Sequence, residues 1–214
     1  MTSWLHDQRF AAVQQVLAAR GCRSVLDLGC GSGDFLLRLV AGSGSIRIVG
    51  VEPDPAPLAI LRADLARLSP GIQRRVRLVQ ASVLEPQHWR QAADAAVMVE
   101  VFEHLDPAHL SRLETALFGE PGAPLVILTT PNADFNPLLG VPPDRFRHPG
   151  HRFEWGRARF RTWAESVAVR WGWAVTVSDI AGNHPTLGGA SQMAVFVRQG
   201  YPTATPVPHS RPSR

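Results

Sequence analysis

Strand-like and helix-like segments alternate five times along this chain, and this alternation limits the fold more than any other feature. The strand-like segments are short and apolar: 24–29, 46–52, 76–82, 95–101 and 125–130. The helix-like segments carry apolar residues at helical spacing: 5–19, 34–40, 55–68, 107–118 and 157–170, with a short one at 86–92. The alternation predicts a parallel sheet with helices on both faces. Two last strands, 174–180 and 192–198, have no helix between them, so we expect an α/β fold with a mostly parallel seven-stranded sheet and an antiparallel edge strand.

Length and composition predict one domain over residues 1–199. The 214 residues are 45% hydrophobic, and residues 200–214, rich in Pro, Ser and Thr, read as a disordered tail. No apolar run approaches the roughly 18 residues of a membrane span, and the start lacks the layout of a signal peptide. Two cysteines, Cys22 and Cys30, are too few for a disulfide framework. We therefore expect a cytoplasmic monomer without a membrane partner.

All lysine-type and arginine-type positive charge of the chain comes from arginine. Net charge is +4, and the sequence contains no lysine. Planar guanidinium groups suit phosphate recognition, although genomic base composition explains the same usage. Basic residues are densest at Arg74-Arg75-Val76-Arg77 and between Arg145 and Arg161.

A glycine-rich turn follows the first predicted strand. The pattern Asp27-x-Gly29-x-Gly31-x-Gly33 is similar to the dinucleotide fingerprint but is spaced differently. Glycines let the backbone approach a ligand, and the following helix directs its positive dipole end toward it. Glu52, at the end of the second predicted strand, could accept hydrogen bonds from two ribose hydroxyls. The alternative is a tight turn beside a solvated acid.

The segment Val25-Leu26-Asp27-Leu28-Gly29-Cys30-Gly31-Ser32-Gly33 resembles motif I of the class I S-adenosylmethionine-dependent methyltransferases. The resemblance covers about residues 24–130 and implies a Rossmann-like fold with S-adenosylmethionine as cofactor. It also implies that Asp27 meets the ammonium group of the methionine moiety, and that Ala81 and Ser82, after the third strand, contact the adenine.

The fourth predicted strand ends in Glu100, and Glu103 and His104 follow at positions i+3 and i+4. If the chain turns into a helical turn there, these three side chains share one face at the mouth of the sheet. Such a face predicts a metal site. The same pattern also occurs in methyltransferases that use no metal. There it is a partly exposed first helical turn, and the positive end of the helix dipole stabilises its acids.

Two downstream segments, Thr130-Pro131-Asn132-Ala133-Asp134-Phe135-Asn136 and Arg147-His148-Pro149-Gly150-His151-Arg152-Phe153-Glu154-Trp155, resemble the RNA 3′-terminal ribose 2′-O-methyltransferases. Together with Asp7-Gln8-Arg9 and the segment 192–197, the resemblance covers about residues 5–198. It implies methyl transfer to the 2′-hydroxyl of the 3′-terminal nucleotide of RNA. It also implies a divalent metal ion bound by two glutamates and two histidines, which here are Glu100, Glu103, His104 and His151.

The chemistry agrees with this resemblance. A ribose hydroxyl is a weak acid, and a metal ion that contacts both the 2′ and 3′ oxygens would lower its pKa and orient it. Such contacts require a free 2′,3′-diol, which occurs only at an RNA 3′ end. Carboxylates with imidazoles suit Mn²⁺, Fe²⁺ or Co²⁺ better than Mg²⁺, although availability can still select Mg²⁺.

Residues 131–156 have no clear periodicity and predict a substrate and metal loop. His148 could accept a proton, orient a phosphate or be an exposed loop histidine. The remaining residues also have two interpretations each. Arg145, Arg147 and Arg152 contact RNA phosphates or are solvated. The aromatic residues either pack in the core or stack on bases: Phe153, Trp155 and Trp163. Asn132 faces the substrate or caps a turn.

The chain departs from that family at three points. Its methyltransferase segment begins near residue 1, so a repair ligase partner is expected in trans. Glu52 replaces the usual Asp, and Pro149-Gly150 removes an acid that would support the second histidine. The alternative function is a metal-independent methyltransferase for a small molecule, with Glu100 to His104 only shaping the pocket. A binding module with a dead site is a third hypothesis, which the intact glycine turn and Glu52 disfavour.

Overall fold

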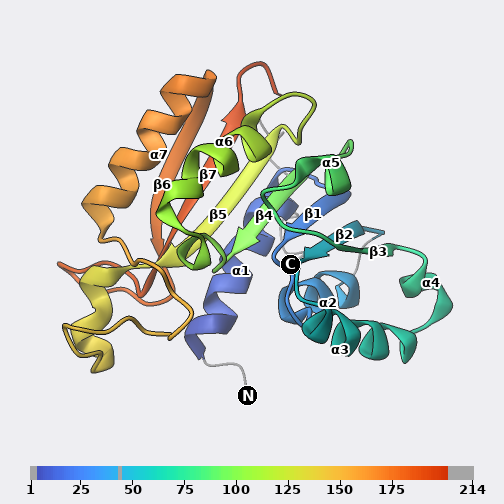
Figure 1. The fold of residues 1–214 in the computed structure, drawn as a ribbon, viewed down its shortest axis with the longest axis horizontal. Helices are drawn as coiled ribbons and strands as arrows, with labels where there is room; N and C mark the ends of the chain where they lie inside the picture. Colours follow the sequence, from blue (N-terminus) through green and yellow to red (C-terminus); the bar gives the residue numbers. More distant parts are fainter. Residues whose placement is uncertain (1–3, 43–44, 202–214) are drawn as a thin grey trace, which may run out of the picture.

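The computed structural model describes residues 4–42 and 45–201. Its centre is one seven-stranded sheet with the strand order β3-β2-β1-β4-β5-β7-β6 (Figure 1). The strands are β1 (Ser24–Leu28), β2 (Arg47–Glu52), β3 (Val76–Gln80), β4 (Ala95–Val99), β5 (Leu125–Pro131), β6 (Trp173–Ile180) and β7 (Ser191–Arg198). The predicted α/β fold is therefore confirmed.

The direction of the strands also follows the prediction. β1 pairs in parallel with β2 and β4, and the parallel pairing extends to β3 and β5. β7 runs antiparallel to both β5 and β6. The antiparallel strand thus lies one place inside the edge, and β6 is the outermost strand.

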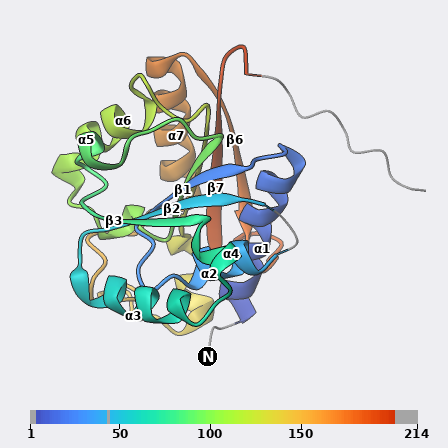
Figure 2. The ribbon, with the colours of Figure 1, turned by 90° about the vertical axis from the view of Figure 1, so that its right-hand side faces the viewer.

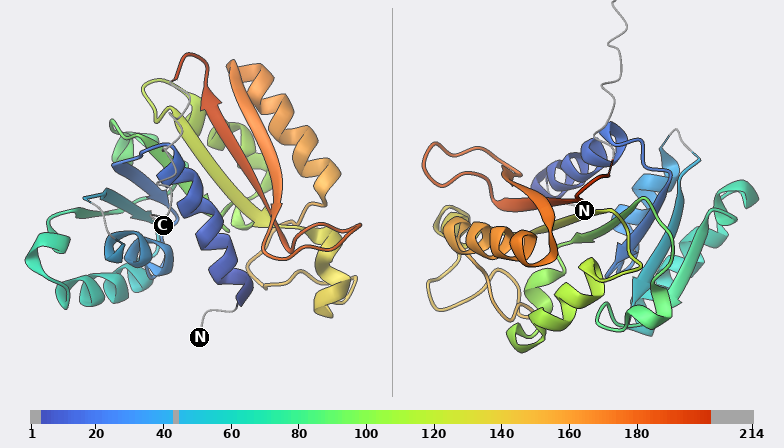
Figure 3. Two further views of the ribbon diagram at one scale, coloured as in Figure 1. Left: turned by 180° about the vertical axis from the view of Figure 1, so that it is seen from behind. Right: turned by 90° about the horizontal axis from the view of Figure 1, so that it is seen from above.

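Helices cover both faces of the sheet. Figure 2 looks along the sheet and shows α5, α6 and α7 on one side and α1 on the other. The left view of Figure 3 shows α1 and α2 in front of the sheet on the face that is hidden in Figure 1. The helices are α1 (Trp4–Ala19), α2 (Asp34–Ala41), α3 (Pro55–Ala66), α4 (Pro70–Gln73), α5 (Pro86–Trp89), α6 (Leu110–Phe118) and α7 (Arg157–Trp171).

Side-chain alternation along the central strands creates the two cores. In β5, Leu125 and Ile127 pack with α1, α2 and α3, whereas Val126 and Leu128 pack with α6 and α7. All four are fully buried. Because both faces are covered, the strand is an uninterrupted apolar run rather than an alternating one, and this run is the pattern by which the sequence predicts it.

The irregular segments differ more from the predictions. The helix expected over 107–118 begins as a 3₁₀ turn, η2 (Pro107–His109), before α6. The loop 131–156 contains a 3₁₀ segment, η3 (Ala133–Leu139), and the short α4 was not predicted. Beyond Tyr201, the predicted tail lies outside the described residues. Within the described ranges no helix has both the length and the apolar character needed to cross a bilayer.

The turn after β4 is anchored by an aromatic cluster. η1 (Phe102–His104) carries Phe102, which is fully buried. Its ring lies 5.0 Å from that of Phe153, 5.2 Å from that of Trp155 and 4.6 Å from that of Trp163, measured between centroids. One side chain thereby fixes three elements relative to one another: the end of β4, the loop 131–156 and α7.

Replacing Phe102 by Ala should lower the free energy of unfolding by about 3–5 kcal/mol, because a fully buried aromatic side chain leaves a cavity. Urea denaturation followed by tryptophan fluorescence measures this change. Val169→Ala is the matched control, since Val169 is 83% exposed, and it should change stability by less than about 0.5 kcal/mol. An equal loss of stability in both variants would contradict the anchoring role of Phe102.

Candidate functional site

The glycine turn between β1 and α2 forms the floor of a two-part cavity. Gly29 has φ +82°, and a Cβ there would lie 2.5 Å from Val101, so the position requires glycine. Gly31 has φ +52° and open space where a Cβ would be. One part of the cavity, of about 150 Å³, is lined by Asp27, Gly29 and Gly31. The other, of about 360 Å³, shares Gly29 and extends to Glu52.

The two predicted cofactor acids line different parts of this cavity. Glu52 accepts hydrogen bonds from the backbone N–H groups of Gly31 (3.1 Å) and Asp54 (3.0 Å). Asp27 is 2% exposed, and its Oδ2 has no hydrogen-bond partner. Burial, reinforced by the Glu52 carboxylate, raises the pKa of Asp27 to about 7. A cationic ligand group beside Asp27 would therefore be stabilised.

The remaining predicted cofactor residues divide between cavity and core. Ser82 lines the larger part of the cavity with Glu52. Ala81 is 6% exposed and belongs to the core on the α6 side, and it is not among the residues that line the cavity. Gly33 packs against Leu61, where a Cβ would lie 2.3 Å from Cδ1. The position therefore requires glycine for close packing of α2 against α3, and its contact with the cofactor stays a prediction.

The end of β4 is strained at Glu100. This residue has φ +57°, which is unusual for a side-chain-bearing residue and marks stored strain. Its N–H donates to the carbonyl oxygen and Oγ1 of Thr129, and Thr129 Oγ1 donates to Oε1 at 3.1 Å. Arg9 of α1 lies 3.2 Å from the same Oε1. Burial still raises the pKa of Glu100, although Arg9 opposes the shift.

Glu103 is the most deeply buried charged group of the site, with 0% exposure. Thr130 Oγ1 donates to Oε2 at 2.9 Å, whereas Oε1 has no hydrogen-bond partner. Burial, and secondly the Glu100 carboxylate, raise the pKa of Glu103 well above its ordinary value. Thus Glu103 has a buried oxygen without a hydrogen-bond partner, and a second acid, Glu100, acts on it electrostatically.

Two neighbouring histidines have Nε2 atoms that form no hydrogen bond with the described residues, and that of His151 faces the oxygen. His104 Nδ1 lies 3.0 Å from the carbonyl oxygen of Gly150, and His151 Nδ1 lies 2.5 Å from Glu154 Oε1. Both partners can only accept, so each Nδ1 carries the proton and each Nε2 keeps its lone pair. His151 Nε2 lies 3.8 Å from Glu103 Oε1. Partial desolvation of the ring, and secondly His151, lower the pKa of His104, which favours the neutral ring.

His148 lies beside these rings with the opposite tautomer. The three histidines each offer one nitrogen within 4.8 Å of the others. However, His148 Nδ1 accepts from the N–H of Gly150 at 3.0 Å, so the neutral ring carries its proton on Nε2. In this arrangement His148 Nε2 can donate a hydrogen bond, and the role of proton acceptor considered from the sequence stays a prediction. Gly150 orients both His104 and His148, and a Cβ there would lie within 3.1 Å of each.

Glu154 is the site residue that sequence reasoning missed. Its side chain is 1% exposed and accepts from His151, from Asn136 Nδ2 (2.7 Å) and from the N–H of Arg147 (2.7 Å). These hydrogen bonds outweigh burial and hold the pKa of Glu154 below its ordinary value. The segment around Arg152-Phe153-Glu154-Trp155 carried the family resemblance, and this was the available signal. Glu154 supplies the acid that Pro149-Gly150 was expected to remove.

Most other predicted loop residues hold the loop in place. Arg147 donates to the carbonyl oxygens of Asn132 and Ala190, so it is neither solvated nor free for a phosphate. Asn132 is buried and caps η3 through Asp134 N–H. The rings of Phe153, Trp155 and Trp163 pack against Phe102. Arg145 and Arg152 are exposed.

The donor set at the end of β4 fits a divalent cation. Glu103 Oε1 is buried and unpaired, and the Nε2 atoms of His104 and His151 hold free lone pairs. Each histidine is oriented by a hydrogen bond from its other nitrogen, as metal-binding imidazoles usually are. Mixed carboxylate and imidazole ligands suit Mn²⁺, Fe²⁺ or Co²⁺. Glu100 and His104 also line the larger part of the cofactor cavity, so the two candidate sites adjoin.

Comparisons with known proteins agree with this geometry. A family model described as a methyltransferase domain matches residues 25–118. The small RNA 2′-O-methyltransferase of Gallus gallus is 31% identical, and the match covers 98% of this chain and 58% of that protein. The protein of the same name from Drosophila melanogaster is 28% identical over 91% of this chain and 54% of its own length. This chain thus spans about half the length of these curated relatives.

Solved structures extend the likeness to the whole domain. The small RNA methyltransferase HEN1 has a TM-score of 0.77 at 28% identity, covering 91% of this chain and 26% of that one. The methyltransferase domain of bacterial CtHen1 has a TM-score of 0.80 at 34% identity, covering 90% of this chain and 99% of that one. The match to bacterial CtHen1 includes the helices and loops as well as the sheet, because it covers 90% of this chain. The chain therefore belongs to the Hen1 family of small RNA 2′-O-methyltransferases.

Proposed function

We propose that this protein transfers a methyl group from S-adenosylmethionine to the 2′-hydroxyl of the 3′-terminal nucleotide of RNA. In this proposal one divalent metal ion, Mn²⁺ or Mg²⁺, is held by Glu100, Glu103, His104 and His151. The observation that carries the proposal is the unpaired, fully buried Glu103 oxygen opposite His151, adjoining the cavity of the glycine turn. A buried carboxylate of this kind requires a cation or a proton.

The residues of the site divide the work of the reaction. Asp27 holds the ammonium group of the cofactor, and Glu52 holds its ribose hydroxyls. The bond between the 2′ oxygen and the methyl carbon forms while the bond from sulfur to that carbon breaks. The sulfonium becomes a neutral thioether, and the hydroxyl proton leaves to solvent. The metal ion, when bound, lowers the pKa of the hydroxyl, and His148 donates from Nε2 to the terminal nucleotide.

The position of the metal ligands also supports selection of RNA ends. His104 is exposed whereas Glu103 is buried, so the site opens to solvent on the His104 side. Two neighbouring oxygens of a terminal diol could enter from there. The repair ligase partner expected in trans stays a prediction. The match to a chain of a Pnkp1/Rnl/Hen1 RNA repair complex, at 18% identity, supports the shared fold alone.

Labelled S-adenosylmethionine, Mn²⁺ and two RNAs of one sequence test the proposed function. One RNA ends in a free 2′,3′-diol and the other in a 2′,3′-cyclic phosphate. Label should appear only on the diol, because the cyclic phosphate has no free 2′-hydroxyl at its end. A chelator should abolish the transfer, and added Mn²⁺ should restore it.

Each alternative function predicts a different result in that assay. Undiminished transfer after chelation, or in Glu103→Gln, would contradict the metal requirement. Label on both RNAs would contradict selection of the 3′ end. Absence of label on any RNA, with intact cofactor binding, would favour the small-molecule methyltransferase.

Glu154→Gln should weaken Mn²⁺ binding about 10- to 100-fold, the usual effect of removing the carboxylate behind a metal-binding histidine. The fold should be retained, because glutamine has nearly the same shape. Isothermal titration with Mn²⁺ measures the affinity directly. Glu165→Gln, an exposed position on α7, is the charge-matched control. Equal Mn²⁺ affinity in the two variants would show that Glu154 does not act through His151.

Asp27→Asn should weaken cofactor binding about 10-fold or more, since it removes the charge opposite the ammonium group. Without cofactor, the same variant should be more stable than the wild type above pH 7. The pKa of Asp27 is raised by folding, from 3.8 to about 7, so stability is lost as pH rises through this range. Thermal unfolding between pH 4 and pH 8 should show the difference growing with pH. A constant difference would contradict the raised pKa.

A further inference from the structure

A hollow lined by arginines lies at the amino-terminal ends of the strands, whereas the candidate active site lies at their carboxyl-terminal ends. It has a volume of about 210 Å³ and is bounded by the first residues of β1, β2 and β3 and by the segment that precedes β4. Its basic lining residues are Arg47, Arg74, Arg75 and Arg77. Three of these come from the Arg74-Arg75-Val76-Arg77 run, for which the proposed reaction has no use.

The positive charge of this hollow comes mainly from Arg47, Arg74 and Arg77, because Arg75 is half-buried and donates to the carbonyl oxygen of Val40. Arg47, Arg74 and Arg77 are exposed and form no ion pair with any described residue. Arg77 donates only to the neutral Gln91. The nearby acid, Asp94, accepts from the backbone N–H groups of Arg23 and Ser24 and also interacts electrostatically with Arg47, so it offsets one positive charge of the cluster and leaves the others. An exposed cluster of unpaired guanidinium groups attracts phosphate.

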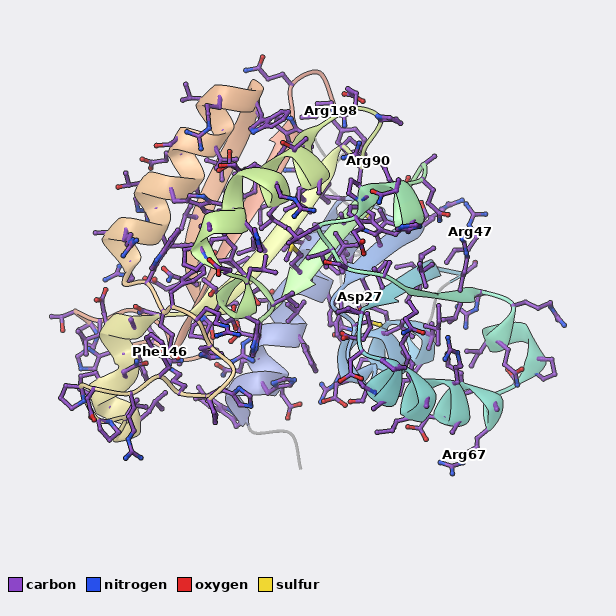
Figure 4. All side chains as sticks on the ribbon, viewed as in Figure 1. Asp27, Arg47, Arg67, Arg90, Phe146 and Arg198 are labelled. Carbon is purple, nitrogen blue, oxygen red and sulfur yellow. The ribbon has the colours of Figure 1, made fainter. Side chains whose placement is uncertain are left out.

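Other arginines at this end of the molecule behave differently. Arg90 donates to the carbonyl oxygens of Thr115 and Ala116, and Arg198 forms an ion pair with Glu120. These side chains hold the structure together. Figure 4 shows Arg47 well separated from Arg90 and Arg198. The arginines of the hollow therefore differ from Arg90 and Arg198, whose guanidinium groups are used within the protein.

The hollow and the cofactor site lie at the two ends of the same strand. β2 begins at Arg47 and ends at Glu52, and five residue steps span about 16–17 Å in a strand. An RNA whose 3′ end lies at the mouth of the site must therefore extend along at least this length to reach the hollow. Only nucleotides upstream of the 3′-terminal one can make this contact.

We propose that the arginine hollow binds the phosphate backbone of upstream nucleotides of the RNA substrate. This inference rests on the proposed function for the identity of the substrate. Guanidinium groups recognise phosphates without reading sequence. The contact would therefore favour longer RNAs irrespective of their sequence, and it would leave the chemistry at the 3′ end unchanged.

The test compares two RNA lengths in a triple variant, Arg47→Ser/Arg74→Ser/Arg77→Ser. An RNA of about 2 nucleotides has a single internucleotide phosphate and is too short to extend along the strand length of about 16–17 Å, whereas one of about 24 nucleotides exceeds the roughly 4–16 nucleotides of a single-strand binding groove and reaches the hollow. For the long RNA, KM should rise about 10- to 100-fold with kcat unchanged. For the short RNA, both constants should match the wild type. Binding of the long RNA should lose about two units of salt slope, near 0.7 for each lost contact.

Two control variants separate charge from position. Arg62→Ser/Arg67→Ser/Arg112→Ser removes the same charge from exposed positions outside the hollow, and it should leave KM for the long RNA nearly unchanged. Figure 4 shows Arg67 far from Arg47. Replacing the three hollow residues by Lys should retain most of the affinity, because each positive charge is kept.

The outcomes distinguish this inference from the proposed function. Methylation of the short RNA together with an unchanged KM for the long RNA in the hollow variant would overturn the inference alone. Failure of the wild type to methylate either RNA would overturn the proposed function. Equal losses in the hollow and control variants would show an effect of net charge and refute the hollow. Unchanged RNA binding with loss of binding to an acidic protein would reassign the hollow to a protein partner.

Discussion

The site depends on one constraint, the complete burial of the Glu103 carboxylate. In water-free surroundings an isolated carboxylate is strongly destabilised unless it is paired or protonated. Here one oxygen accepts from Thr130, and the other has no partner. The backbone around Glu103 is equally fixed, because its carbonyl oxygen accepts from the N–H of Arg152 at 2.8 Å. This bond ties the end of β4 to the loop that carries His151, so the same residue fixes both halves of the proposed metal site.

Several features of the site oppose folding and are tolerated because the two cores are extensive. Glu100 has a left-handed backbone conformation, and Asp27 has a buried oxygen without a partner. Local strain and unpaired groups of this kind each cost on the order of 1–3 kcal/mol. The strands that carry them are buried on both faces, so the surrounding structure holds these conformations in place. Binding of cations at Asp27 and Glu103 would relieve the two electrostatic costs, which links ligand binding to stability.

Segments with a strong pattern of burial were predicted well from the sequence, and short or irregular segments were not. Strands β1, β2, β4 and β5 were predicted closely because burial on both faces leaves a long apolar run. The short α4 and the 3₁₀ turns lack such a signal, because three or four residues bury too little surface to impose a pattern. At the site, glycine spacing located the cofactor turn. The tautomers of His104 and His148 and the place of Ala81 in the core depend on contacts between distant segments, and no local pattern encodes these.

The distribution of charge across the sheet connects the metal site with the arginine hollow. Asp27, Glu52, Glu100 and Glu103 all lie at or near the carboxyl ends of β1, β2 and β4, where an RNA phosphate would be repelled. Arg9 and a metal ion would offset part of this repulsion beside Glu100 and Glu103. Neither provides attraction along the length of an RNA. Unpaired arginines at the far edge would supply that attraction without adding positive charge near the sulfonium of the cofactor, where it would oppose cofactor binding. Affinity for RNA and binding of a cationic cofactor thus favour placing the two kinds of charge at opposite ends of the same strands.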